Sequence, residues 1–502
     1  MIINNIPILT FLVWIPIISG LIIFFLDKYK DRQLFYISIF ISSLILILSL
    51  LLLYKFNFSS HTLQFIEKTI WIKNFGINYF LAVDGISILF ILLTTITTFL
   101  IVIFITTEKY LQINKLLSLF LILEGLLIGV FCSFDSILFY IFFEAILIPL
   151  FLIIGIWGGN NRIYATIKFF LYTLFGSVLM LVSLIYLSIQ ADSFSILDMY
   201  SLNLSLSTQI FLFISFLIAF GIKTPMWPVH TWLPDAHVEA PTTGSVILAG
   251  VLLKVGGYGM IRFLLPITTD AGIYLNDYLI PLSLIAIIYI SFVAIAQQDM
   301  KKLIAYSSVA HMGFVTLGIF LIFNFLEKNT YNQDAALLGL QGAIMQMLSH
   351  GLISAALFLC IGIIYSRTQS KLIDNQSGII QSMPIFSAFM IFFLLANSGL
   401  PGTSGFVGEF MVILASIKAN FLYAFLASLT LVLAASYSLW LGKRVIFGNP
   451  KNTLALSEIN TTEFMVLLIL VIMVLFIGLK PEIIMIIMNE TTTHIINSLQ
   501  KG

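Results

Sequence analysis

Several ionisable side chains lie inside long apolar stretches, where a charge is costly and therefore indicates chemistry. They are two lysines, three glutamates and two histidines: Lys223, Lys254, Glu124, Glu144, Glu409, His311 and His350. A charge at the centre of a bilayer costs about 2.5–3.5 kcal/mol on insertion scales. Only 9% of the chain is charged. Buried charges in so apolar a chain favour a role in moving protons or ions.

Glu144 lies in the apolar stretch FYIFFEAILIP. An isolated carboxylate there would take up a proton, so it needs a partner, and Lys223 at comparable depth is the natural one. Burial favours the neutral forms of both groups, whereas pairing favours the charged forms. A pair whose separation changes can therefore exchange a proton. The alternative is a static buried ion pair, which would contribute little net stability.

Lys254 has no acidic residue within a helical turn. A buried unpaired lysine can be neutral and accept a proton, which makes Lys254 the candidate central relay. The alternative is that its side chain reaches the membrane interface. His311 and His350 follow in the chain and could pass a proton from one ring nitrogen to the other; alternatively, each is a hydrogen-bonded core residue. Glu409 would be the terminal carboxylate.

Other polar residues carry weaker signals. Glu124 could assist the relay or simply hydrogen-bond locally, and Asp84 and Asp135 are expected to be caps or interface groups. The segment from Val229 to Pro241 contains histidines but lacks metal-ligand spacing such as HExxH. We expect a turn there that admits water or protons, with no metal. The sequence shows no nucleotide-binding motif, and a net charge of +1 argues against nucleic-acid binding.

The elements that must position these groups are membrane-spanning helices. The chain is 60% hydrophobic, and apolar runs long enough to cross about 30 Å of hydrocarbon recur throughout. These runs do not alternate as barrel strands would. We therefore expect an all-α polytopic membrane protein with about 14 spans: 7–26, 34–54, 84–106, 116–133, 136–157, 165–189, 209–228, 243–264, 276–296, 302–324, 335–365, 383–416, 421–441 and 463–487.

Two of these spans should be broken. Span seven contains Pro225 and Pro228, and span twelve contains Pro401 among glycines. Proline removes a backbone donor and clashes with the preceding turn. Each break carries an ionisable residue, and the breaks are five spans apart. This pattern predicts two inverted five-helix repeats, spans 4–8 and 9–13. Kinks that serve packing alone are the alternative.

We treat residues 1–502 as a single membrane domain. It comprises N-terminal spans in 1–115, a first repeat in 116–264, a second in 276–441 and a C-terminal region in 463–502. Span eleven is long, and a kink or local unwinding is expected near His350. A short extramembrane hairpin is expected within residues 55–83, whose aromatic and β-branched residues surround Asn74-Phe75-Gly76.

The distribution of basic residues predicts the orientation. Loops after odd-numbered spans hold Lys28, Lys30, Arg32, Lys109, Lys115, Arg162, Lys168, Lys301, Lys302, Arg367, Lys371, Lys443, Arg444 and Lys451. Loops after even-numbered spans and the C-terminal end hold Lys55, Lys68, Lys73, Arg262, Lys328, Lys418, Lys480 and Lys501. Only Lys223 and Lys254 remain outside both sets. The richer, odd-numbered loops should face the cytoplasm or matrix, and both termini the opposite side.

Three motifs resemble the proton-pumping antiporter-like subunits of respiratory complex I. They are KTPMWPVHTWLPDAHVEAP from Lys223, IAYSSVAHMG from Ile304 and LPGTSGFVGEF from Leu400. The resemblance covers about spans three to thirteen. Related sodium/proton antiporter subunits share it. Glu409 distinguishes the types, because the chain-4 type, chain M in bacteria, carries glutamate where the others usually carry lysine.

The resemblance implies a function in which NADH oxidation and ubiquinone reduction in other subunits drive protons through this one. Glu144 and Lys223 would be the coupling pair, Lys254 the central relay, His311 and His350 the connecting groups, and Glu409 the exit carboxylate. NADH, FMN, iron–sulfur clusters and ubiquinone would be bound by other subunits, with no cofactor in this chain. Its partners would be the other membrane-arm subunits, including two further antiporter-like subunits, together with lipids. The location would be the mitochondrial inner membrane, with the termini on the intermembrane-space side, or the bacterial plasma membrane.

Overall fold

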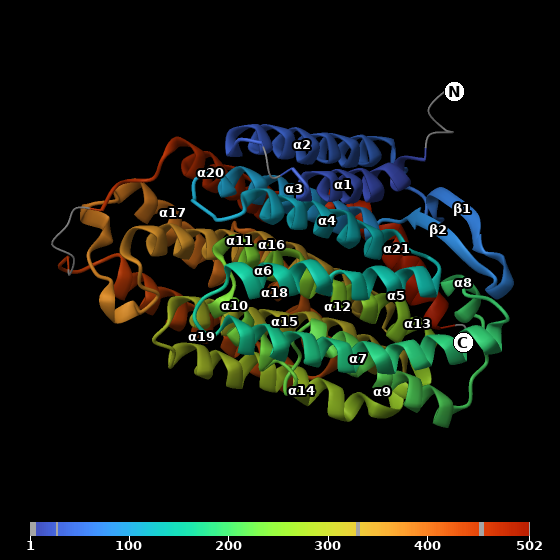
Figure 1. The fold of residues 1–502 in the computed structure, drawn as a ribbon. Helices are drawn as coiled ribbons and strands as arrows, with labels where there is room; N and C mark the ends of the chain where they lie inside the picture. The colour runs from blue at the N-terminus through green and yellow to red at the C-terminus, as the bar shows by residue number, and fades with distance from the viewer. Residues whose placement is uncertain (1–6, 27–28, 328–331, 451–455, 501–502) are drawn as a thin grey trace.

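The structure, a computed structural model, describes residues 7–26, 29–327, 332–450 and 456–500. Lys28, Lys328, Lys451 and Lys501 from the charge count lie outside this range. The described part is a bundle of helices with one β-hairpin (Figure 1). The first half contains α1 (Ile8–Phe24), α2 (Asp31–Lys55), β1 (Gln64–Ile72), β2 (Ile77–Val83), α3 (Ser87–Ile105), α4 (Ile113–Cys132), α5 (Ser136–Ala145), α6 (Leu147–Trp157), α7 (Arg162–Ala191), α8 (Ile196–Met199), α9 (Leu206–Lys223), α10 (Trp232–Glu239), α11 (Thr242–Ile247), α12 (Leu253–Gly259) and α13 (Leu265–Ile267).

The second half is helical throughout its described elements. It contains α14 (Thr269–Ile295), α15 (Met300–Leu326), α16 (Gln333–Thr368), α17 (Pro384–Asn397), α18 (Ser404–Ala419), α19 (Phe421–Val445), α20 (Thr461–Leu479) and α21 (Glu482–Leu499). In the described residues, 12 helical segments are long and apolar enough to cross a membrane, and α1 and α17 are shorter apolar helices. The prediction of an all-helical polytopic membrane protein is confirmed.

Two helical segments lie at the centre of the bundle. In the most apolar stretches of Thr242–Ile267 and of α16, 100% of the residues are buried. In the corresponding stretch of α2, only 33% of the residues are buried. In Figure 1, α12, α15, α16 and α18 lie between α1 and α2 on one side and α7, α9 and α14 on the other. The central segments are therefore shielded from lipid by protein. Polar side chains on them contact other side chains rather than hydrocarbon, which lowers the cost of carrying them.

Both predicted breaks are present. Helix α9 ends at Lys223, two residues before Pro225, and the chain resumes as the short α10. Helix α17 ends at Asn397, and α18 begins at Ser404 after a turn in which Gly399 and Gly402 have positive φ angles of 75° and 90°. Such angles are accessible to glycine at little cost. The prolines and glycines of the sequence thus act as expected.

A third interruption follows Glu144. Helices α5 and α6 are separated at Ile146, and Pro149 lies one turn further on. The proline ring clashes with the carbonyl of the residue four positions earlier, here Ala145, which ends α5 at that residue. From the sequence, span 136–157 was predicted to be continuous. The interruption matters because it lies immediately next to a candidate functional carboxylate.

Helix α16 is not unwound at His350. Its 36 residues form one α-helix from Gln333 to Thr368, so the expected local unwinding is wrong. The irregularity lies instead in the neighbouring span, where π-helical turns at Leu248–Leu252 and Met260–Leu264 flank Lys254. Nothing in the local sequence, which lacks proline between these turns, marks them. Such turns are frequent at functional sites.

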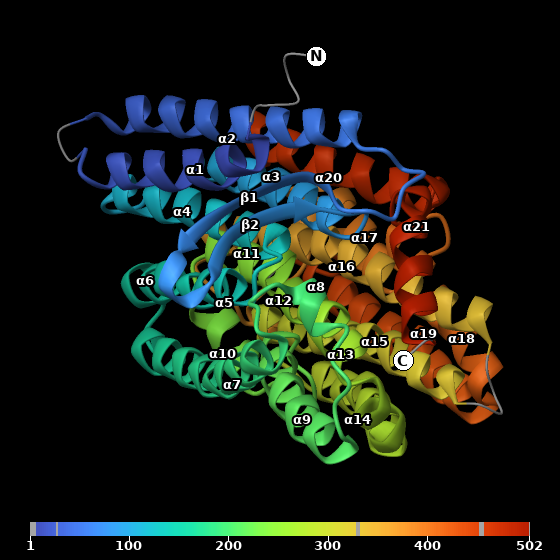
Figure 2. The ribbon, with the colours of Figure 1, turned by 90° about the vertical axis from the view of Figure 1, so that its right-hand side faces the viewer.

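The expected hairpin is present, with β1 and β2 pairing antiparallel. It lies at one end of the bundle beside α8 and α21 (Figures 1 and 2). Asp135 fixes its position: one carboxylate oxygen accepts from the Asn78 backbone N–H at 2.9 Å, and the other caps α5 through Ile137 and Leu138. The loop after α3 is separated from the hairpin by the full length of that helix, so the two lie at opposite ends of the bundle.

Candidate functional site

Lys223 and Glu144 lie at two of the breaks but do not form a direct ion pair. The Lys223 side chain is fully buried, and its Nζ donates to the Phe143 carbonyl at 3.4 Å and lies 4.2 Å from the Phe143 ring centroid. Glu144 is half-buried, interacts with the Ser177 hydroxyl, and has one oxygen, Oε1, without a hydrogen-bond partner among the described residues. The Glu144 and Lys223 side chains interact electrostatically, although no hydrogen bond joins them. The expected close pairing is therefore not formed in this structure.

Lys254 does not reach the membrane interface. Its side chain is fully buried, and its Nζ lies 2.5 Å from the Ala249 carbonyl and 2.8 Å from Nδ1 of His350. The Ala249 carbonyl belongs to the first π-helical turn. The alternative that Lys254 snorkels to the surface is wrong, and the structure instead joins it directly to one of the two predicted histidines.

His311 and Glu409 form the second contact of the predicted line. The distance between His311 Nδ1 and Glu409 Oε1 is 2.7 Å, and both side chains are nearly inaccessible. On the other side of the ring, Nε2 of His311 lies 3.2 Å from the Tyr437 hydroxyl. Gln346 Nε2 donates to the same Glu409 oxygen at 3.1 Å. Each polar atom of the His311 ring thus has a partner.

The two contacts lie next to each other. The rings of His311 and His350 are 6.0 Å apart between centroids, and a cavity of about 10 Å³ lies beside them, bounded also by Gln346, Ser349 and Glu409. A cavity of about this size can hold one water molecule. Lys254, His350, His311 and Glu409 therefore form a line across α12, α16, α15 and α18, with hydrogen-bond distances at its two ends and a water-sized cavity beside the two histidines.

Close approach of α18 to α16 requires a glycine. A Cβ added at Gly408 would lie 2.5 Å from the backbone nitrogen of Gln346 and 2.7 Å from its Cα. Because these are backbone atoms, no side-chain rotation can relieve the contact. Gly408 thus sets the separation at which Glu409 meets Gln346 and His311.

A buried cation was assigned wrongly from the sequence. Arg262 was counted as a loop residue, but it lies in the second π-helical turn, and its guanidinium forms an ion pair with Asp84 in which the side chains are 7% and 3% exposed. Asp84 also caps α3 through the backbone nitrogens of Ile86 and Ser87. The cap expected at Asp84 is confirmed. Lys223 and Lys254 are therefore not the only basic residues inside the helical part of the bundle.

Glu124 is not joined to the line. It is fully buried, and both carboxylate oxygens are without hydrogen-bond partners among the described residues. The structure also adds two residues that the sequence analysis did not select, Gln346 and Tyr437. Gln346 was visible as a polar residue in an apolar run, whereas Tyr437 carried no signal. Within the described ranges, no group of three or more His, Cys, Asp or Glu side chains is placed to hold a metal ion.

This arrangement can carry protons. Histidine can receive a proton on one ring nitrogen and release it from the other, and a buried lysine or glutamate can exist in either protonation state. Gaps between the groups can be bridged by water. No nucleophile activated by a base is found in the line.

The chain is similar to known proteins over nearly its whole length. Residues 133–434 match the family model described as NADH:quinone oxidoreductase/Mrp antiporter, transmembrane. The chain is 44% identical to a protein named NADH-quinone oxidoreductase subunit M from Rickettsia prowazekii, over 98% of this chain and 99% of the relative. It is 41% identical to a protein named NADH-ubiquinone oxidoreductase chain 4 from Marchantia polymorpha, over 97% and 96%.

Solved structures give a similar result. A chain in respiratory complex I from Thermus thermophilus with bound NADH superimposes with a TM-score of 0.87, at 29% identity, over 98% of this chain and 99% of that one. A chain of the Mrp complex from Dietzia sp. DQ12-45-1b superimposes with a TM-score of 0.85 at 17% identity. The second likeness concerns the fold alone.

Proposed function

The chain belongs to the NADH:quinone oxidoreductase/Mrp antiporter family, and we propose the path by which it conducts protons. It is a proton-translocating membrane subunit of the complex I type and carries no redox site. Protons pass along Lys254, His350, His311 and Glu409. The observation that carries the proposal is the continuity of this line, with contacts of 2.8 Å and 2.7 Å on either side of one water-sized cavity.

Glu144 and Lys223 would couple the line to its neighbours. Their charges are separated, and each is next to a helix interruption, where a small backbone shift changes the separation at little cost. Moving Glu144 towards Lys223 would favour the charged forms of both. A change in the charges of this pair would then alter the balance between a proton on Lys254 and a proton on His350.

Partners and location follow from the family. The partners are other complex I subunits, and we propose that they include two further antiporter-like subunits, with the cofactors bound elsewhere in the assembly. The chain is a multi-pass membrane protein of either the mitochondrial inner membrane or the bacterial plasma membrane. We propose that the loops after odd-numbered spans face the matrix or cytoplasm and that both termini face the opposite side.

The test is substitution of the coupling lysine in the assembled complex. Lys223→Ala should abolish NADH-driven acidification of sealed vesicles while NADH oxidation by a water-soluble artificial acceptor persists. Lys302→Ala is the matched control, because Lys302 lies at the start of α15, away from the line. Unchanged proton pumping in Lys223→Ala would refute the coupling role.

A sodium/proton antiporter subunit is the other candidate. Shared fold supports it, but the identity to the Mrp chain is 17%, against 44% to a subunit M. Sodium transport that persists in vesicles without NADH would favour this second function.

A further inference from the structure

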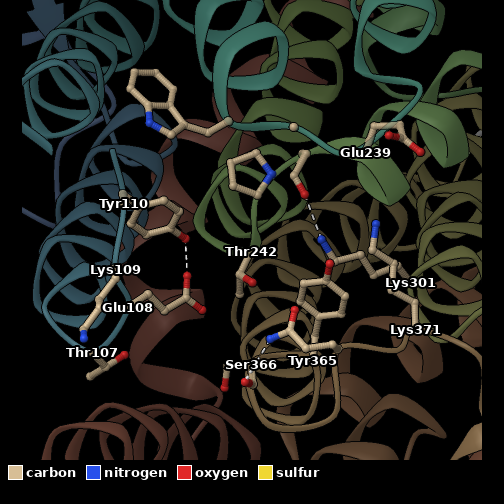
Figure 3. Close-up of a pocket in the computed structure, with 16 residues that line it drawn as sticks. Thr107, Glu108, Lys109, Tyr110, Glu239, Thr242, Lys301, Tyr365, Ser366 and Lys371 are labelled. Carbon is tan, nitrogen blue, oxygen red and sulfur yellow. Dashed lines mark hydrogen bonds between the residues drawn. The ribbon is translucent and has the colours of Figure 1, made fainter. Parts of the chain in front are cut away.

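The two ends of the bundle are built differently. At the end opposite the hairpin, polar side chains converge on a cavity of about 550 Å³, among them Lys301 and Glu108 of the loop after α3 (Figure 3). At the hairpin end, α12 and the π-helical turn after it meet the start of α3 and the end of α4, and aromatic rings pack together there. A polar cavity at one end thus contrasts with an aromatic cluster at the other.

Tyr258 lies at the centre of this aromatic cluster, and its side chain is 1% exposed. Its ring meets that of Phe131 edge to face, with centroids 5.2 Å apart, and lies 6.0 Å from that of Phe90. Its hydroxyl donates to the Phe131 carbonyl at 2.9 Å, and the hydroxyl oxygen lies 3.0 Å from Ser87 Oγ. Both the ring and the hydroxyl of Tyr258 are therefore held in place.

The Arg262–Asp84 ion pair lies against the same ring. The centre of the Arg262 guanidinium is 5.1 Å from the Tyr258 ring centroid and 5.3 Å from that of Phe134. A cation in such a position is attracted to the ring faces. Phe134 in turn packs 6.1 Å from Phe80, which belongs to β2. From the interior of the bundle towards the hairpin, the order is thus Tyr258, Arg262, Phe134 and the hairpin itself.

Lys254 lies on the interior side of Tyr258. The two residues are four positions apart on α12, so they share one face of the helix. A helical side chain covers the turn before its own Cα, so Tyr258 covers the face of α12 between Lys254 and Arg262. The Lys254 side chain itself points the other way, because its Nζ contacts the Ala249 carbonyl, five positions earlier in the chain, and His350.

The hydrogen bonds on the hairpin side of Lys254 do not form a path for protons. They run from the Arg262 guanidinium to Ser87 Oγ at 3.3 Å, then to the Tyr258 oxygen, and end at the Phe131 carbonyl. A carbonyl has no proton to pass on. An arginine side chain does not release its proton in proteins, and the Asp84 oxygens are occupied by Arg262 and by the α3 cap.

We propose that Tyr258, held by the Arg262–Asp84 pair, is the seal that separates Lys254 from the aqueous phase at the hairpin end. Tyr258 and Arg262 carry no proton in this role; they block one. A direct connection from that phase to Lys254 would let protons run back through the chain and dissipate the gradient. The inference rests on the proposed function, because the group that the seal isolates is the first member of the proposed proton line.

The test measures proton leak without NADH. Sealed vesicles that hold the assembled complex are given a pH gradient that is acidic on the hairpin side. In Tyr258→Ala, the missing ring leaves room for water, so the gradient should decay several times faster than in the wild type. Tyr258→Phe keeps the ring and should hold the gradient. Decay at the wild-type rate in Tyr258→Ala would overturn the seal, as would equal decay in Tyr258→Ala and Tyr258→Phe.

Phe213→Ala is the matched control for the loss of a buried ring. Phe213 is fully buried on α9, and its ring packs 6.0 Å from that of Phe323 on α15, away from Lys254. It should hold the gradient, and a leak equal to that of Tyr258→Ala would show a general packing defect and overturn the assignment. Tyr258→Leu, a smaller truncation, repeats the test if Tyr258→Ala does not assemble, and wild-type decay in it counts equally against the seal.

Lys254→Met separates this inference from the proposed function. Added to Tyr258→Ala, it should restore the wild-type decay, because the leak passes through the Lys254 amine; a leak that persists would overturn the assigned role of Tyr258. On its own, Lys254→Met tests the proton line, which fails if NADH-driven pumping is normal. If Lys254→Met stops pumping and Tyr258→Ala does not leak, the line stands and only the seal is wrong.

Discussion

Replacing Asp84 by Asn should destabilise the bundle strongly, because it leaves the Arg262 charge buried without its partner. The guanidinium and the carboxylate are 7% and 3% exposed. Asn can keep the cap, since Asp84 Oδ1 accepts the two backbone bonds at 3.0 and 2.9 Å and the other oxygen pairs with Arg262. With the cap kept, the amide NH2 of Asn faces the guanidinium, so Arg262 loses both the negative charge and the acceptor.

The magnitude follows from burial. Removing one partner of a buried ion pair costs about 3–5 kcal/mol, whereas replacing both partners by apolar groups is often neutral. Asp84→Asn should therefore lower the free energy of unfolding by about 3–5 kcal/mol. The double variant Asp84→Asn with Arg262→Met, which keeps the cap and removes the unpaired charge, should recover most of that loss. Asp374→Asn is the surface control: the Arg444–Asp374 pair is 26% and 62% exposed, so its loss should cost at most about 1 kcal/mol.

Cys132 provides the assay. It is fully buried and follows Phe131, whose ring lies 5.2 Å from that of Tyr258. In a Cys360→Ser background, labelling of Cys132 by a thiol-reactive dye on heating the detergent-solubilised complex reports opening of this region. Asp84→Asn should strongly lower the temperature at which Cys132 becomes labelled, whereas Asp374→Asn should not change it. The reasoning is refuted if Asp84→Asn shifts no more than the control, or if the double variant is as unstable as the single one.

Two further outcomes are expected. Gly408→Ala should lower proton pumping and cost about 1–3 kcal/mol of stability through overpacking, because its Cβ would meet Gln346 backbone atoms at 2.5 and 2.7 Å. The control Gly442→Ala should be neutral, because its Cβ would meet only the flexible Leu394 Cδ1 at 3.2 Å. Equal effects of the two variants in thermal melts and pumping assays would contradict this expectation. The pKa of Glu108 is raised in the folded chain by burial, so its contribution to stability is present below the unfolded-state pKa and is lost as pH rises through the folded-state pKa; Glu108→Gln should weaken the decline of thermal stability as pH rises above the ordinary pKa of a glutamate, about 4.3, and an identical pH profile in the wild type and this variant would show the reasoning wrong.

Local chemistry explains why the breaks could be predicted. Proline lacks an N–H and clashes with the turn before it wherever it stands in a helix, so Pro225 marked the end of α9 without tertiary information. The same rule applied to Pro149, which was overlooked. The π-helical turns around Lys254 had no such marker. Their residues are compatible with an ordinary α-helix, so packing is what remains to account for them: the first turn packs against α3 and α16, and the second against α9.

The partners of the charged residues were predicted less well. The order Lys254, His311, His350, Glu409 along the chain suggested a relay, yet the contacts run from Lys254 to His350 and from His311 to Glu409. Arg262 was assigned to a loop because it lies near the end of an apolar run. It is buried because Asp84, 178 positions away, arrives from the loop before α3. Tyr437 joined the site only through its contact with His311, which depends on how neighbouring helices pack.

The sequence by itself determined that this chain is a bundle of membrane-spanning helices with broken spans and a few buried charges. Hydrophobicity, proline geometry and the cost of burying charge are properties of short segments, and lipid leaves the backbone few alternatives to a helix. Tertiary structure alone decided which charges meet. The hydrogen bonds of under 3 Å join residues about a hundred positions apart, so they depend on the spacing and rotation of the helices. Close packing at glycines such as Gly408 sets that spacing, and no short segment of the sequence encodes it.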